Sequence, residues 1–117
     1  MSSYVLILEN SEKRSLQVGK LGTITFEPGY YYYVGSAKKI SRVVRHFNAK
    51  AKKWHIDHIS GIFTVIGAIL FKIPECELAS KITLITFKKI PNFGCSDCEC
   101  ESHLFYSKNL TIENLFA

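Results

Sequence analysis

Short apolar stretches with a period of two occupy the first third of the chain and predict β-strands. Tyr4–Leu8 is expected to form a first strand, followed by a polar turn. Ser15–Val18 and Thr23–Phe26 alternate apolar and polar residues, as the strands of a hairpin with one solvated face do. After the turn residues Pro28 and Gly29, a run of four tyrosines opens a further strand over Tyr30–Val34. Alternation would place two of these tyrosines against the core and two toward solvent or a ligand. Because aromatic residues favour strands in any case, we expect Tyr30–Tyr32 to be strand and core residues and only Tyr33 to belong to a functional site.

The period changes after Gly35, where the pattern becomes that of an amphipathic helix of about two turns. Its apolar positions follow the spacing i, i+3, i+4 and i+7: Ile40, Val43, Val44 and Phe47. On the opposite face, the pattern places three polar side chains: Arg42, Arg45 and His46. Arg42 and His46 are four residues apart, so we expect them to project side by side.

The second half of the chain predicts four more elements. Lys50–Ser60 is expected to form a helix or turn, and the β-branched run Ile62–Phe71 a buried strand. Pro74–Ile82 predicts a helix with proline in its first turn, and its apolar face consists of Leu78, Ala79 and Ile82. His103–Tyr106 predicts a closing strand. Together the elements predict a small α+β fold, a mostly antiparallel sheet flanked by helices.

Length and hydropathy suggest one domain over residues 1–117 that does not enter a membrane. The longest apolar run, Gly61–Phe71, has eleven residues, whereas a membrane-spanning helix takes roughly 20. The first residues lack the basic flank of a signal peptide. We therefore expect a soluble, cytoplasmic protein.

Charge is unevenly distributed along the chain. The formal net charge is +5, and no Asp or Glu occurs from Pro28 to Ile56, a segment that holds seven of the fifteen basic residues. A block of one sign suits an anionic polymer, nucleic acid first and a membrane surface second. The alternative is a solvated basic surface without a partner.

The order of residues from Tyr33 onward suits chemistry on a phosphodiester. A strand ends at Gly35, where the backbone can approach a phosphate, and a helix with Arg42 and His46 follows. A tyrosine, an arginine and a distant carboxylate suffice for cleavage of such a bond. The carboxylate holds a hard cation, the arginine offsets transition-state charge, and a phenol or imidazole positions or deprotonates water.

The block from Tyr33 to Phe47 closely resembles the second half of the GIY-YIG nuclease domain, which occurs in phage homing endonucleases and in the incision subunit of bacterial nucleotide excision repair. Three more segments extend the resemblance, to a small prokaryotic branch of that family, over nearly the whole chain: Lys53–Asp57, Glu75–Ala79 and Gly94–Tyr106. The resemblance implies a small antiparallel sheet with flanking helices and DNA cleavage with one divalent metal, Mg²⁺ or Mn²⁺. It also implies DNA and other DNA-repair proteins as partners.

The same resemblance assigns the catalytic positions. Tyr33 matches the tyrosine of the second motif half, Gly35 its glycine and Arg42 the helix arginine, while His46 matches a histidine present in part of the family. In place of the first half, Gly-Ile-Tyr, the chain has Ser2, Ser3 and Tyr4. Tyr4 is therefore the counterpart of the first tyrosine, and the glycine is missing.

The metal-binding glutamate implied by the resemblance is Glu75 or Glu77. The family pattern places an apolar residue three positions after this glutamate on the same helix face, and Glu75 with Leu78 and Ala79 fits it, so we favour Glu75. In the alternative, Glu75 is only a favourable acid at a helix N-terminus. The implied further active-site residues are His55 and Asp97. The positions expected to contact DNA are Gly35, Ser36, Lys38, Lys39, Arg45, Lys52 and Lys53.

The cysteines add a second candidate metal site. Apart from Cys76, they crowd into six residues as Cys95, Cys98 and Cys100. Without a secretory signal, we do not expect a disulfide framework. With His103 they offer four zinc ligands within nine residues, at a spacing tighter than in common zinc fingers. In the alternative, Ser96, Asp97 and His103 border the active site and the cysteines pack beneath it.

Three functions remain open from the sequence. The first is a metal-dependent DNA endonuclease active in DNA repair or processing. The second is a non-catalytic nucleic-acid-binding module of the same fold, which the missing glycine of the first motif half favours. The third is a zinc-stabilised interaction domain, which rests on the cysteine segment alone.

Overall fold

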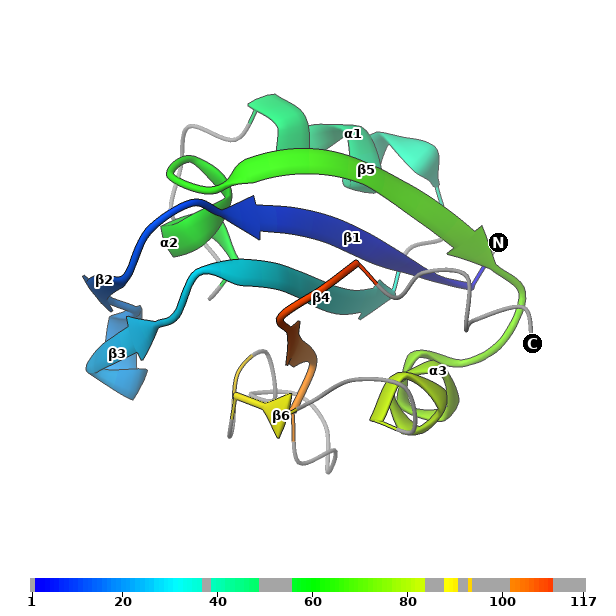
Figure 1. Cartoon of the computed structure of the whole chain (residues 1–117). Coiled ribbons are helices and arrows are strands. Elements are labelled where there is room, and N and C mark those ends of the chain that lie inside the picture. The colour runs from blue at the N-terminus through cyan, green and yellow to red at the C-terminus, as the bar shows by residue number, and fades with distance from the viewer. Residues whose placement is uncertain are drawn as a thin grey trace.

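The computed structural model shows a five-stranded sheet with helices on both faces and a two-stranded ribbon at one end (Figure 1). The structure describes residues 2–36, 39–48, 56–83, 88–90, 93 and 102–110, apart from the side chains of residues 42, 45, 48, 83 and 88. Its elements in chain order are β1 (Ser3–Asn10), β2 (Arg14–Gln17), the 3-10 helix η1 (Gly19–Leu21), β3 (Thr23–Phe26), β4 (Gly29–Ser36), α1 (Ile40–Asn48), α2 (Asp57–Ser60), β5 (Thr64–Phe71), α3 (Glu75–Thr83), β6 (Lys88–Lys89) and β7 (Leu104–Ser107).

The main sheet has the strand order β5-β1-β4-β7-β6, and each neighbouring pair is antiparallel. The predicted α+β class with a mostly antiparallel sheet is therefore confirmed. Strands β2 and β3 form the separate ribbon, and their residues alternate between outer and inner positions as the sequence predicted. Within the described parts of the chain, no helix is long and apolar enough to span a membrane.

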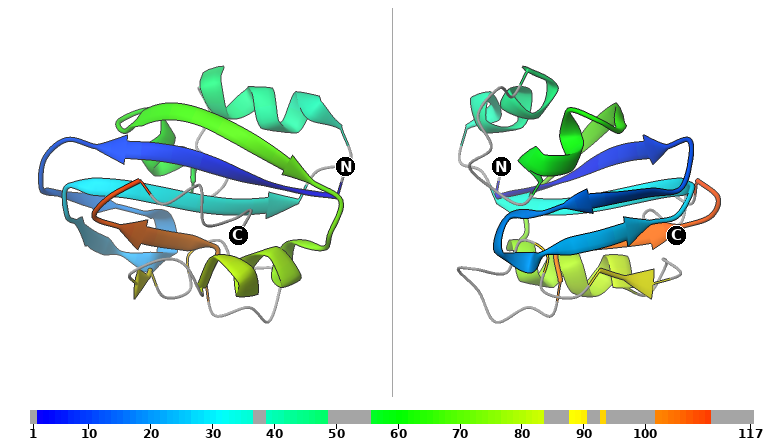
Figure 2. Two further views of the ribbon diagram at one scale, coloured as in Figure 1. Left: turned by 45° about the vertical axis from the view of Figure 1, so that its right-hand side comes forward. Right: turned by 90° about the vertical axis from the view of Figure 1, so that its left-hand side faces the viewer.

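The central strands are covered on both faces, whereas β5, which was predicted to be a buried strand, is an edge strand with exposed apolar side chains, so that prediction is wrong. Helices α1 and α2 pack on one face, and α3 packs on the other (Figure 2). Side chains alternate between two cores: Tyr31 and Tyr33 of β4 enter the core beneath α1 and α2, and Tyr32 enters the core beneath α3. The prediction that Tyr30–Tyr32 are core residues is confirmed for Tyr31 and Tyr32, and alternation leaves no tyrosine of this run on an open face, since only Tyr30 is even partly exposed. The physical reason is that helices cover both faces of this sheet, whereas alternation alone says nothing about the outer face.

Helix α3 presents its predicted apolar face, because Leu78, Ala79 and Ile82 are all buried against the sheet. Pro74 immediately precedes the helix, and its carbonyl accepts a hydrogen bond from the Leu78 amide at 3.0 Å. Proline suits this place because the first helical amides have no partner within the helix.

Helix α1 is rotated relative to the sequence prediction. It buries Val43 and His46, which are three residues apart, and exposes the other apolar residues of the predicted stripe: Ile40, Val44 and Phe47. The prediction that His46 lies on the outer face of this helix, opposite the buried stripe, is therefore wrong. A buried phenol of the sheet supplies the reason, because a buried polar group needs a hydrogen-bond partner and His46 is that partner.

Candidate active site at one end of the sheet

The candidate site lies where β1 begins and β4 ends. The antiparallel register pairs Tyr4 with Gly35 and Leu6 with Tyr33, so the two tyrosines project from the same face of neighbouring strands. Their ring centroids are 6.3 Å apart. The strand pairing thus brings together two tyrosines that are 29 positions apart in the sequence.

His46 of α1 completes a cluster with these tyrosines. Its Nε2 lies 2.5 Å from the Tyr4 hydroxyl, and its ring centroid is 5.4 Å from that of Tyr4 and 5.9 Å from that of Tyr33. All three side chains are buried; Tyr33, at 9% exposed, is the most accessible. A short hydrogen bond shielded from water is stronger than the same contact at the surface, so the pair is suited to holding or moving one proton between phenol and imidazole.

Gly35 makes this arrangement possible. A Cβ atom at this position would lie 2.4 Å from both Cζ and Oη of Tyr4, far inside van der Waals contact. The Tyr4 ring therefore lies directly over the Gly35 backbone. The sequence prediction expected this glycine to let a phosphate approach, whereas in the structure the close approach is made by the phenol ring and Gly35 is buried.

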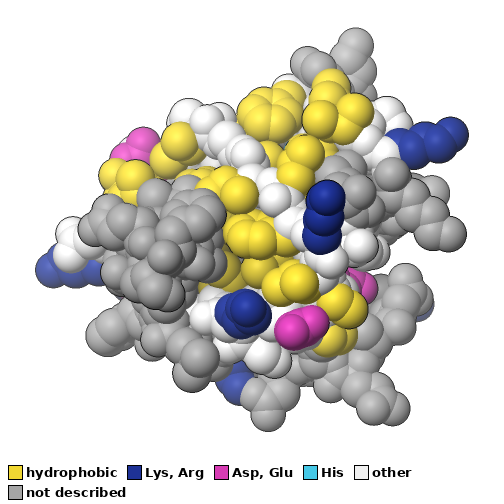
Figure 3. All heavy atoms as spheres, turned by 90° about the vertical axis from the view of Figure 1, so that its right-hand side faces the viewer, with side chains coloured by type: hydrophobic (Ala, Val, Ile, Leu, Met, Phe, Trp, Pro, Cys, Tyr) yellow, Lys and Arg dark blue, Asp and Glu magenta, His cyan; other side chains and the backbone are white. Residues whose placement is uncertain are grey.

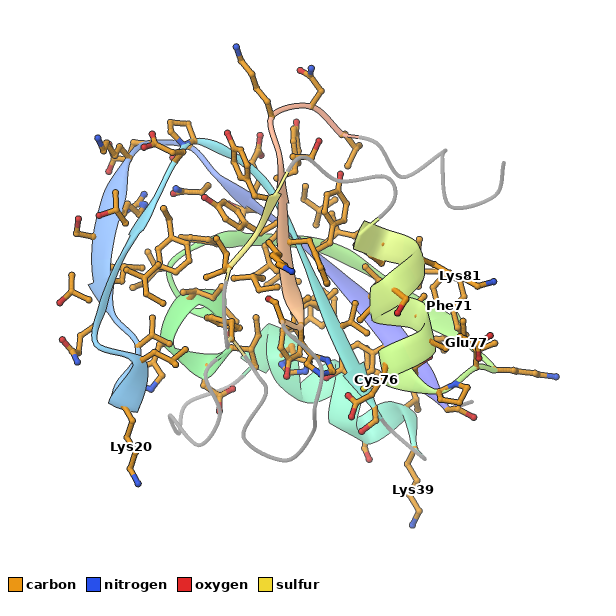
Figure 4. The ribbon with its side chains drawn as sticks, turned by 90° about the horizontal axis from the view of Figure 1, so that it is seen from below. Lys20, Lys39, Phe71, Cys76, Glu77 and Lys81 are labelled. Atoms are coloured by element: carbon orange, nitrogen blue, oxygen red, sulfur yellow. The ribbon has the colours of Figure 1, made fainter. Side chains whose placement is uncertain are left out.

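Arg42 lies in α1 one helical turn before His46, at the spacing that places residues on one side of a helix. Arg45 lies in the same helix, and the side chains of both arginines are outside the described part of the structure. Ser36 ends β4, and Lys39 is exposed just before α1, where it projects into solvent (Figure 4).

Glu75 lies on the other face of the sheet, in the first turn of α3. Its Oε2 is 3.6 Å from Nδ1 of the buried His103, and its side chain is 31% exposed. The same His103 nitrogen lies 3.0 Å from the Val34 carbonyl oxygen. A carbonyl only accepts, so Nδ1 carries a proton and donates it there. Glu77 is exposed on the outer side of the helix, as is Lys81 (Figure 4).

The structure thus joins some predicted site residues and separates others. It unites Tyr4, Tyr33, Gly35 and His46, and it places Glu75 with His103 at the same end of the sheet but across it. His103 was predicted as a zinc ligand or, in the alternative, as a residue that borders the active site, and no local pattern in the sequence indicated its contact with Glu75. Several predicted residues lie outside the described part of the chain: Lys38, Lys52, Lys53, His55, Cys95, Asp97, Cys98 and Cys100.

The described residues include some of the candidate metal ligands. In the described residues, no group of three or more His, Cys, Asp or Glu side chains could hold a metal ion. Mg²⁺ needs fewer protein ligands, since it is commonly bound by one or two carboxylates together with waters and substrate phosphates. The partly exposed carboxylate of Glu75 fits that kind of binding.

Cys76 follows Glu75 in the first turn of α3 and is disulfide-bonded. The sequence prediction expected no disulfide framework and assigned no bond to Cys76, so this bond is a finding of the structure. Local spacing among the later cysteines did not indicate this bond, because Cys76 lies far from them in sequence.

These features define a small α+β protein with a buried Tyr-His-Tyr cluster at one end of an antiparallel sheet. The chain belongs to the family described as Domain of unknown function DUF123, whose match covers residues 3–116. Neither a curated protein nor a solved structure matches the chain.

Proposed function

We propose that this protein is a metal-dependent endonuclease that hydrolyses DNA phosphodiester bonds during DNA repair or processing. The observation that carries the proposal is the contact between the Tyr4 hydroxyl and His46 Nε2, with Tyr33 packed against both rings. The resemblance to the GIY-YIG nucleases supports it, because the residues in this cluster are those that the resemblance assigned to catalysis.

In the proposed reaction, a water molecule attacks the phosphorus and the P–O bond to the leaving sugar oxygen breaks. With Nδ1 protonated, neutral His46 accepts the Tyr4 proton at Nε2, and the phenolate then accepts a proton from the attacking water. The imidazolium returns its proton to the phenol, which passes one to the leaving oxygen, so the site ends as it began. Arg42 offsets the charge that develops on the phosphate.

Glu75 is the proposed holder of Mg²⁺ or Mn²⁺, which would act as a Lewis acid on a phosphate oxygen. The basic segment before and within α1 is the proposed DNA-binding face, and binding there should weaken as salt rises. Zinc at the cysteine segment stays a prediction, and elemental analysis of the purified protein tests it.

A matched set of variants tests the nuclease proposal on supercoiled, branched and damaged DNA with Mg²⁺ or Mn²⁺. Tyr4→Phe, His46→Gln and Arg42→Ala should each lower cleavage by about 10²-fold or more. Tyr31→Phe is the control, since this tyrosine is equally buried in the same core but donates its hydrogen bond to a backbone carbonyl. For the metal site, Glu75→Gln should abolish cleavage and the exposed Glu77→Gln should not.

The second candidate function is a nucleic-acid-binding module without turnover. The burial of Tyr4 and His46, at 1% and 2% exposed, favours it, because a proton-transfer group must reach its substrate. If the wild-type protein binds DNA in a salt-dependent way and leaves every substrate intact with either metal, the nuclease proposal fails and the binding module stands.

A further inference from the structure

The outer side of α1 and the strand β5 expose large apolar side chains. Three lie one turn apart along α1 and two lie on β5: Ile40 (59% exposed), Val44 (50%), Phe47 (48%), Ile66 (48%) and Leu70 (42%). We call these five residues the α1–β5 surface. At this end of the molecule, hydrophobic side chains form a band that runs down from the top of the view (Figure 3).

The two elements of this surface are neighbours. Helix α1 lies beside β5 (Figures 1 and 2). Leu70 pairs with Tyr4 across the strands, and Tyr4 contacts His46 of α1. Leu70 therefore projects from the sheet face that α1 covers. The helix buries the side that carries Val43 and His46, which leaves its apolar side free to contact another molecule.

Strand β5 is also an edge of the sheet. In the part of the chain that the structure describes, it pairs with β1 alone, so its other edge presents backbone donors and acceptors. Proteins block such edges with charged side chains or proline, and Thr64–Phe71 contains neither. A register shift interrupts the pairing opposite Ile7 and Leu8, which leaves Gly67–Phe71 as the regular stretch.

We propose that the α1–β5 surface is the interface with a second copy of this chain, related by a two-fold axis. An antiparallel pair of identical strands is self-complementary, as a two-fold interface must be. Charge along β5 does not oppose such pairing. Two chains of net charge +5 repel each other, yet Gly61–Phe71 carries no charge, and antiparallel pairing keeps the two Lys72 residues at opposite ends.

The apolar area is of the right size for a dimer of moderate affinity. Five large side chains, each about half exposed, offer ~400 Å² of apolar surface per copy, taking ~80 Å² for each. A standard interface buries about 800 Å² per partner, of which roughly 60% is apolar. The α1–β5 surface thus supplies most of the apolar share, and the β5 backbone and its flanks supply polar contacts.

Sedimentation velocity on the full chain tests the proposal, after removal of nucleic acid and in high salt, so that DNA cannot bridge two copies. We expect a monomer–dimer equilibrium between ~1 and ~100 μM. Leu70→Lys and Val44→Lys should each make the protein monomeric throughout this range. Leu110→Lys is the matched control, since Leu110 is also 42% exposed but lies outside the surface, and it should dimerise like the wild type.

Two results would overturn the inference. One is a wild-type protein that stays monomeric up to ~100 μM, which would mean that the α1–β5 surface binds a different protein and not a second copy. The other is a dimer that survives both lysine substitutions while circular dichroism shows all variants folded. Neither result depends on nuclease activity.

Discussion

Substitution of Gly35 by alanine tests the central contact of the candidate site. The added Cβ would lie 2.4 Å from two atoms of the Tyr4 ring, and this ring cannot move aside easily because it is 1% exposed in the core. Overpacking of this kind costs about 1–3 kcal/mol. Displacement of the ring also breaks the buried hydrogen bond to His46, which costs about 1–3 kcal/mol more. We therefore expect Gly35→Ala to lower the free energy of unfolding by about 2–6 kcal/mol.

Urea unfolding measures this change, with Gly67→Ala as the control. Gly67 is also a strand glycine of the main sheet, but a Cβ there meets nothing within 4 Å, so its replacement should change stability by less than about 1 kcal/mol. The replacement Tyr4→Leu should remove most of the cost of Gly35→Ala, because the clashing ring is gone. If Gly35→Ala and Gly67→Ala have the same stability, the ring does not lie over Gly35 and the reasoning is wrong.

Three further predictions concern the packing around the site. Val43→Ala should destabilise the protein by about 1–3 kcal/mol, and the adjacent Val44→Ala by less than about 0.5 kcal/mol in dilute solution. The reason is that the two side chains are 4% and 50% exposed. Equal losses of stability in chemical denaturation would refute the orientation of α1. Burial first, then the neighbouring Tyr106 and Glu27, raises the pKa of Tyr31 above its ordinary value of 10.0. As pH rises, the Tyr31 phenol loses its proton in the unfolded chain before it does so in the folded chain. The free energy of unfolding is therefore kept below pH 10 and falls above it by up to about 1.4 kcal/mol per pH unit. Tyr31→Phe should show a shallower fall in unfolding measurements at alkaline pH, and an identical fall would contradict the assignment. Reduction, or Cys76→Ser, should lower the free energy of unfolding by about 2–4 kcal/mol, which is the usual contribution of a disulfide. A melting temperature that does not change when reductant is added would contradict this prediction.

The disulfide and the predicted cytoplasmic location lead to different expectations for thiols. The cytosol keeps most thiols reduced, whereas Cys76 is disulfide-bonded in the structure. Mass spectrometry of alkylated protein, with and without prior reduction, distinguishes the two states. The location stays a prediction.

Local pattern was sufficient for most of the fold. The strands β1, β3 and β7 and the helix α3 agree with their predicted ranges to within two residues at each end, because each depends on a period that can be read along a short segment. The resemblance assigned Tyr4 and Tyr33 as the two tyrosines of one site, and the pairing of β1 with β4 brings them onto neighbouring strands. The two-residue strand β6 was missed, as it has too few residues to show a period.

What the sequence could not determine is which face of α1 turns inward. The stripe of Ile40, Val44 and Phe47 is as good a core-facing pattern as any in the chain, yet α1 rotates to give the Tyr4 hydroxyl a partner in His46. That choice depends on a contact between residues 42 positions apart. The sequence by itself determined most of the elements, and the resemblance it carries assigned Tyr4, Tyr33 and His46 to one site. Only the tertiary structure decided that Gly35 makes room for a ring, that Glu75 lies across the sheet beside His103, and that an apolar side of α1 remains exposed. Periodicity is a local property, whereas burial of a polar group is decided by whichever distant partner can satisfy its hydrogen bond.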